Sequence, residues 1–218
     1  MGIASRRAGG LVMWLRWILS TAVGFTVGGV GAIILGFVEL ARCRNDCDVV
    51  AAIVWSTVVT PGSLLLGGAL AAVLQAWLVL SGFVPRPGWW IVVSAAGFLS
   101  FPIIQRVLPL DRNTAAIITL LASGAIVGVL QWAFLRTRLP RAGWWILGAI
   151  LVYGPVSWFL VLELGLFWGP WGWLWLLLMV GELVALGIGI GASSGAILAW
   201  MVRHRRARLR TTRSALLR

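Results

Sequence analysis

The stretch GVLQWAFLRTRLPRAGWWILGA (Gly128–Ala149) sets a glutamine, three arginines, a proline and two adjacent tryptophans inside an otherwise apolar chain. Upstream, AAVLQAWLVLSGFVPRPGWWIVVSA (Ala71–Ala95) has the same layout, and Gln75 falls on Gln131 when the two stretches are aligned. Self-similarity of this kind indicates an architecture built from copies of one supersecondary unit.

Further copies lie toward both ends of the chain. When Gly124 is aligned with Gly191, the segments Gly124–Arg138 and Gly191–Arg205 both end in Arg-x-Arg. Leu198 then stands at the position of Gln131. Near the N-terminus, RAGGLVMW (Arg7–Trp14) echoes RAGWWILG (Arg141–Gly148). We therefore predict three helical hairpins, each beginning at a basic, Trp-bearing edge and returning on a glycine-bearing helix.

The composition predicts that these hairpins lie in a membrane. The chain has 218 residues, of which 61% are hydrophobic and 11% charged, whereas soluble domains are about 45–50% apolar and about 25% charged. Apolar runs near 20 residues are typical of transmembrane helices. Six spans fit best: roughly Trp17–Val38, one ending at Leu80, Gly88–Ile104, Asn113–Leu135, Trp144–Gly165, and one ending at Val202.

The first span is interpreted as a retained helix. Arg6 and Arg7 precede an apolar run, as in a signal peptide, but Trp17–Val38 is long for such a peptide and no small-residue cleavage site follows. We accordingly expect an all-α fold with a six-helix transmembrane domain over residues 1–202. Its hairpin repeats are expected at about 7–80, 86–135 and 141–202, before an Arg-rich cytoplasmic tail at 203–218.

The charges separate across the six spans. All 18 basic residues are arginine. With six spans, one side holds no acid and 14 arginines, while the other holds Arg42, Arg44, Arg106, Arg112 and all six acids. Because basic residues favour the cytoplasmic side, both termini are predicted to be cytoplasmic in a bacterial plasma membrane. The arginines there are expected to contact anionic lipid headgroups, and nucleic acid is not an expected partner.

Helix packing is expected to depend on small residues and two amides. Residues four apart lie on one helix face and let two backbones approach closely. Gln75 and Gln131 each follow a glycine of such a face by nearly two turns, so each should point at a neighbouring helix. The structural interpretation is an interhelical amide, and the functional alternative is a polar substrate contact. The small residues proposed for packing are Gly24, Gly28, Gly124, Gly128, Gly187, Gly191 and Gly195.

An outer polar site is the main candidate for chemistry. Glu163 and Glu182 are the acids inside apolar runs, and intramembrane carboxylates are often functional. Both are expected near the outer interface, where they either meet headgroups, pair with Arg106 or Arg112, or converge as a cation or proton site.

Other chemistries find little support in the sequence. Cys43 and Cys47 are expected on the oxidising face, where a disulfide is one interpretation, and the pair is a weak metal site because no histidine accompanies it. His204, in the tail, is the one histidine in the sequence, and the sequence contains no lysine. We expect no enzymatic activity, no cofactor and no metal.

Two segments depart from the repeat, and both are expected on the outer side. These are Val49–Thr60 and the Trp-rich Trp168–Met179, which precede returning helices. Each could be an interfacial helix, a re-entrant piece or a helix extension. An interfacial segment is the favoured interpretation.

The unit Gly-x-x-x-Gly-x-x-Gln-Trp, followed by a basic turn and PRAGWW, resembles a loose group of small, uncharacterised bacterial multi-pass membrane proteins. The resemblance covers Gly124–Trp145 and Gly68–Trp90, and it implies no activity or site residues. The leading hypothesis is a non-catalytic accessory or scaffold subunit that packs against partner helices in a larger membrane complex, against lipids, or against a lipophilic ligand. The alternative is a small-solute or ion carrier with an outer carboxylate site.

Overall fold

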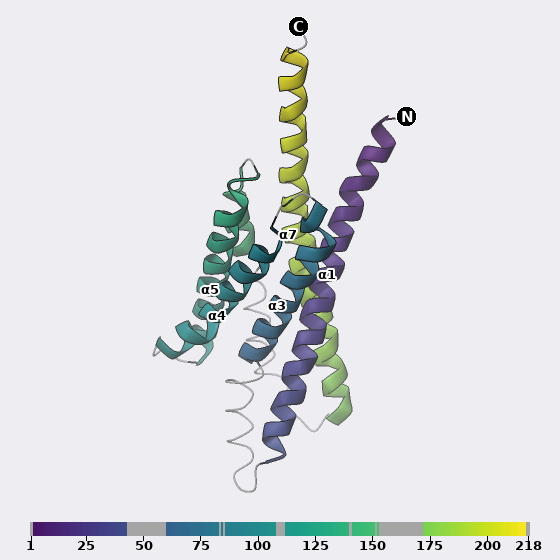
Figure 1. Cartoon of the computed structure of the whole chain (residues 1–218). Helices are drawn as coiled ribbons and strands as arrows, with labels where there is room; N and C mark the ends of the chain where they lie inside the picture. The colour runs from purple at the N-terminus through teal and green to yellow at the C-terminus, as the bar shows by residue number, and fades with distance from the viewer. Residues whose placement is uncertain are drawn as a thin grey trace.

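The computed structural model is an all-helical bundle (Figure 1). It describes residues 2–42, 60–82, 84, 86–107, 112–139, 141–150, 152 and 172–216. Residues 144–150 are also helical. The labelled helices are α1 (Gly2–Leu40), α3 (Thr60–Leu78), the short 3₁₀ turn η2 (Leu80–Gly82), α4 (Gly88–Val107), α5 (Arg112–Leu135) and α7 (Gly172–Leu216).

Glycines mark where neighbouring helices touch. A Cβ placed on Gly24 of α1 would collide with the backbone of Ala71 in α3. On the other flank of α1, a Cβ on Gly187 of α7 would lie 2.6 Å from Ala22 Cα. Absent side chains therefore let α1 approach both α3 and α7 closely, as in small-residue packing of membrane helices.

The remaining contacts close the helices into a ring. Gly68 of α3 packs under Phe98 of α4, and α4 contacts α5 where a Cβ on Gly97 would lie 2.6 Å from Val127 Cγ2. The helical segment 144–150 completes the circle between α5 and α7. It does so through Gly128 against Ala149, and through Gly148 against Ile197.

The outer surface of the ring is apolar. Large hydrophobic side chains are exposed along every described helix, including Leu15, Trp77, Ile103 and Ile188. Within the described residues, five helices are long and apolar enough to cross a membrane. The structure therefore confirms the expected all-helical fold class and a bundle whose helices are long enough to span a membrane.

The ends of two helices differ from the sequence expectations. α1 begins at Gly2, about four turns before the expected start at Trp17. α7 runs without interruption from Gly172 to Leu216, so Gly172–Met179 is the first part of that helix and not a separate interfacial segment. The Arg-rich tail, through Leu216, is likewise a continuation of α7. Figure 1 shows both chain ends at the same end of the bundle.

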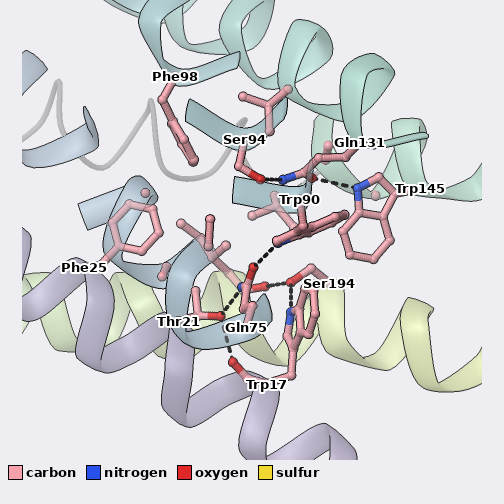
Figure 2. A pocket seen from close by; sticks show the side chains of 18 of the residues that line it. Trp17, Thr21, Phe25, Gln75, Trp90, Ser94, Phe98, Gln131, Trp145 and Ser194 are labelled. Atoms are coloured by element: carbon pink, nitrogen blue, oxygen red, sulfur yellow. Dashed lines mark hydrogen bonds between the residues drawn. The ribbon is translucent and has the colours of Figure 1, made fainter. Parts of the chain in front are cut away.

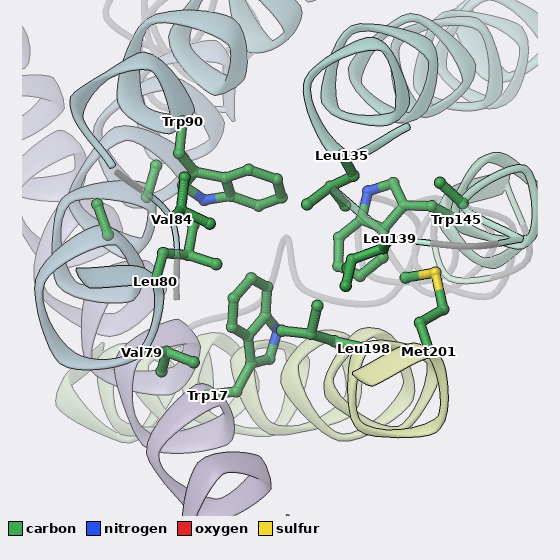
Figure 3. Close-up of a cluster of buried hydrophobic side chains, with 13 residues drawn as sticks. Trp17, Val79, Leu80, Val84, Trp90, Leu135, Leu139, Trp145, Leu198 and Met201 are labelled. Atoms are coloured by element: carbon green, nitrogen blue, oxygen red, sulfur yellow. The ribbon is translucent and has the colours of Figure 1, made fainter. Parts of the chain in front are cut away.

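The turns at that end repeat one design. After α3 and after α5, the chain folds back and buries one apolar side chain, Val84 or Leu139, at the end of the ring. The Val84 amide donates to the Leu80 carbonyl at 2.8 Å, and the Leu139 amide donates to the Leu135 carbonyl at 2.8 Å. All four of these side chains are buried in one hydrophobic cluster (Figure 3).

The core has two apolar layers. The layer beside the turns contains Trp17, Trp90 and Trp145 together with Leu198 and Met201 (Figure 3). The second layer is centred on aromatic and aliphatic side chains deeper in the ring: Phe25, Leu64, Ala71, Phe98, Phe101, Leu120, Val127 and Ile190. Polar side chains lie between the two layers, and they form the candidate site.

Candidate functional site: a tryptophan and amide centre in the helix ring

Each Trp-Trp pair divides its two side chains between the interior and the surface. Trp89 is 56% exposed and Trp90 is 0% exposed, while Trp144 is 56% exposed and Trp145 is 4% exposed. Adjacent residues point about 100° apart around an α-helix, so one indole can face outward while the next faces the core. The second tryptophan of each pair therefore faces the protein interior, although adjacent tryptophans beside arginine are typical of headgroup-level anchors at a membrane interface.

The three buried tryptophans meet one another across the ring. Trp17, Trp90 and Trp145 come from α1, α4 and the segment 144–150 (Figure 3). Their ring centroids are 5.7–5.9 Å apart in all three pairs, with interplanar angles of 65–89°. Edge-to-face geometry of this kind is favourable for aromatic rings. We call this group the tryptophan triangle.

Gln75 joins two hairpins to the triangle. Its Oε1 accepts a hydrogen bond from Trp90 Nε1 at 3.0 Å, and its Nε2 donates to Thr21 Oγ1 at 2.9 Å. Thr21 Oγ1 in turn donates to the Trp17 carbonyl at 2.8 Å. The amide therefore connects α3 to α1 of its own hairpin and to α4 of the next (Figure 2).

Gln131 makes the same two bonds one hairpin further along the chain. Its Oε1 accepts from Trp145 Nε1 at 2.8 Å, and its Nε2 donates to Ser94 Oγ at 2.8 Å (Figure 2). Interhelical hydrogen bonds in membranes contribute about 0.6 kcal/mol on average and up to about 1.7 kcal/mol. Four such bonds therefore specify the arrangement of the ring more than they stabilise it.

The contact between the segment 144–150 and α7 replaces this polar arrangement with an apolar one. Leu198 stands at the glutamine position and is buried beside the triangle. Ala149 follows Trp145 by four residues, as Thr21 follows Trp17 and Ser94 follows Trp90. An amide at 198 would thus lack its hydroxyl partner. The Trp17 indole donates instead to Ser194 Oγ at 2.9 Å, one turn before Leu198.

This register corrects the N-terminal alignment. Matching Arg7 with Arg141 had placed Trp14 opposite Gly148, whereas the triangle places Trp17 opposite Trp145. Trp14 Nε1 donates to the Ala192 carbonyl at 2.9 Å and takes no part in the triangle. The sequence reasoning missed Trp17, although a hydroxyl or small residue four positions after each inward tryptophan was a usable signal.

A cavity of about 50 Å³ lies on the axis of the ring, next to the triangle. Every described helical segment of the ring contributes to its wall (Figure 2). The described wall carries no charged side chain. It consists of Trp17, Thr21, Phe25, Gly68, Ala71, Ala72, Gln75, Trp90, Ser94, Phe98, Val127, Gln131, Trp145, Gly148, Ala149, Val152, Ile190, Ser194 and Ile197.

The glycines proposed for packing lie inside the ring. Gly28 meets the backbone of Gly67, as Gly24 meets Ala71. A Cβ on Gly191 would lie 2.8 Å from Ile18 Cα, and one on Gly195 would lie 2.9 Å from Trp17 Cδ1. Gly124 is buried in α5. These faces are therefore occupied by this chain's own helices.

Three of the four residues of the expected outer polar site lie in described helices. Glu182 lies in α7 with its Oε2 buried and without a hydrogen-bond partner. Arg106 is exposed near the end of α4, and Arg112 begins α5. Glu163 lies outside the described residues, as do Cys43 and Cys47.

Comparison with known proteins adds no assignment. No protein-family model, curated protein or solved structure matches this chain. Among the described residues, no group of three or more histidine, cysteine, aspartate or glutamate side chains could hold a metal ion. The arrangement of the described residues is suited to packing helices and to enclosing a small uncharged guest.

Proposed function

We propose that this chain is a non-catalytic integral protein of a bacterial plasma membrane, acting as an accessory or scaffold subunit of a larger complex. The proposal includes six spans with both termini in the cytoplasm. The arginines at the turns and in the tail support that orientation, because basic residues are retained on the cytoplasmic side.

The observation that carries the proposal is the use of polar groups inside the ring. Gln75 and Gln131 are committed to bonds that join helices, and the described cavity wall is uncharged. A carrier for charged solutes needs groups that pair with the charge of its substrate, whereas each amide here uses its oxygen and one N–H to hold neighbouring helices together. The large apolar outer surface is the part free to meet lipid or a partner helix.

One outward face is suited to a partner helix. Gly181, Ala185, Gly189 and Ser193 lie four residues apart on α7, and all four are exposed. A Cβ on Gly181 or Gly189 would meet nothing within 4 Å. Small residues at this spacing let another transmembrane helix approach closely, and the corresponding stripes on α1 and α7 are already used inside the ring.

Gly189→Leu is expected to release the partner while leaving the chain folded. The leucine would push a docked helix away but has open space in the isolated chain. The measurement is co-purification from native membranes in a gentle detergent, with the partner identified by mass spectrometry. Gly31→Leu, also in open space but on α1, is the control and should retain the partner. A chain that purifies alone before any substitution would refute the accessory role.

A second candidate function rests on three oxygen atoms without partners. Thr119 Oγ1, Ser123 Oγ and Glu182 Oε2 are buried and make no hydrogen bond in the structure. Thr119 and Ser123 lie in the first half of α5, and Glu182 lies in the first half of α7. Both helix starts are on the proposed outer side, so each of these groups is a candidate solute contact of a carrier in the outer half of the bundle.

Glu182→Gln separates the two functions. A carrier that uses this carboxylate would lose cation- or proton-coupled uptake in membrane vesicles by tenfold or more, because the amide cannot ionise. An accessory subunit would keep its partner, and vesicle uptake would be unaffected by the exchange. Arg106→Gln, which changes an exposed charge at the same side, is the control.

A further inference from the structure

The cavity beside the tryptophan triangle has hydrogen-bond donors that the protein does not use. Ser94 Oγ accepts a hydrogen bond from Gln131 Nε2, but the Ser94 hydroxyl hydrogen is donated to none of the described residues. The other hydroxyls at this level, those of Thr21 and Ser194, both donate to a carbonyl of their own helix. Ser94 is 1% exposed, so water outside the ring cannot supply the missing acceptor.

The two glutamines add to this unused donor capacity. An amide nitrogen carries two hydrogens, and Gln75 and Gln131 each use one, toward Thr21 and Ser94. Both glutamines line the cavity, as does Ser94 (Figure 2). The polar part of the wall therefore offers donors to a guest that carries an accepting oxygen.

The deeper part of the wall is apolar. Phe25 and Phe98 meet edge to face, with ring centroids 6.3 Å apart, and Val127 and Ile190 pack in the same layer. An ionised guest at this depth would have no opposite charge among the described wall residues, and burial of an unpaired charge is strongly unfavourable. The wall thus selects for a neutral guest with one polar and one apolar end.

The size of the cavity limits the guest to a few atoms. A cavity needs about 10–15 Å³ of space for the centre of a water-sized sphere to hold one water molecule. The volume of about 50 Å³ therefore accommodates about three to five heavy atoms. We propose that this cavity binds a small neutral amphipathic molecule, with an amide or alcohol oxygen at Ser94 and the glutamines and a short alkyl part against Phe25 and Phe98.

This binding site is independent of the accessory role and can be tested on the purified full chain. Four three-carbon probes would be compared by titration calorimetry and thermal unfolding in detergent: propionamide, 1-propanol, propionate and propylammonium. Propionamide and 1-propanol are expected to bind saturably and raise the unfolding midpoint. Both ions are expected to bind at least tenfold more weakly, because neither finds a counter-charge in the wall.

Ser94→Ala supplies the test of position. It removes the unused donor and should weaken propionamide binding at least about fivefold. Ser100→Ala is the matched control, since Ser100 lies on the same helix, donates to the Gly97 carbonyl and does not line the cavity. No saturable binding of either neutral probe would overturn the proposal and leave water as the occupant. Equal binding of the ions, or equal effects of the two serine variants, would also overturn it. The four-probe comparison on the unaltered chain stands even if Ser94→Ala fails to fold.

Discussion

Replacing Trp90 with alanine is expected to lower the free energy of unfolding by about 2–4 kcal/mol. In water-soluble proteins, a buried Trp→Ala change costs about 3–5 kcal/mol. Part of that cost is transfer from water, which is absent when the reference state is separated helices in lipid. What remains is the void left in the triangle and the loss of the bond from Trp90 Nε1 to Gln75 Oε1.

The neighbouring residue provides the control for this prediction. Trp89→Ala removes the same side chain one position away, but Trp89 is more than half exposed, so the expected change is within about 0.5 kcal/mol. Both variants would be unfolded by titration with sodium dodecyl sulfate and followed by circular dichroism. Equal losses in the two variants would mean that the tryptophan triangle does not stabilise the ring.

The equivalence of Gln75 and Gln131 was accessible from the sequence because it depends on local patterns. Gln75 and Gln131 recur with the same spacing from glycine and the same Trp-bearing turn, so both could be assigned to one unit. In the structure they accept from Trp90 and Trp145 in the same way. The repeated pattern therefore predicted equivalent positions for the two glutamines, without predicting which atoms would meet.

The triangle could not be predicted because it depends on helix rotation and on contacts between hairpins. An adjacent Trp pair is typical of a membrane interface, and nothing local states which of the two indoles turns inward. Trp17 has no tryptophan directly before it, so the pair pattern that marks Trp90 and Trp145 is absent from the first hairpin. Its role follows from closure of the ring, where α1 lies between α3 and α7.

The apolar contact between the segment 144–150 and α7 shows how the polar contacts depend on one another. Leu198 stands at the position of the amides of Gln75 and Gln131. Ala149 stands at the position of the hydroxyls that accept from those amides. Keeping either group alone would bury an unpaired polar atom, which costs about 1–3 kcal/mol. Replacement of both groups together removes that cost, and Ser194 supplies the acceptor that the Trp17 indole still requires.

Gly24→Leu is expected to disrupt the ring more severely than any loss of a hydrogen bond. The Cβ of any residue at this position would overlap the backbone of Ala71, and a helix backbone cannot rotate away as a side chain can. Overpacked cores typically lose about 1–3 kcal/mol when neighbours can adjust. Because α1 and α3 would have to separate here, we expect a loss of about 3 kcal/mol or more.

The separation would extend to the site itself. Thr21 precedes Gly24 by three residues and accepts the bond from Gln75, so displacement of α3 should break that bond and free the Trp90 indole. Detergent titration would measure the loss of stability, and the emission maximum of the buried tryptophans should shift to longer wavelength as water enters. Gly31→Leu is the matched control on the same helix, because its added side chain meets open space. Leucine also favours helix over glycine by nearly 1 kcal/mol, so this control should be neutral or slightly stabilising. If Gly24→Leu behaved like Gly31→Leu, close packing of α1 against α3 could not be what holds the amide centre together.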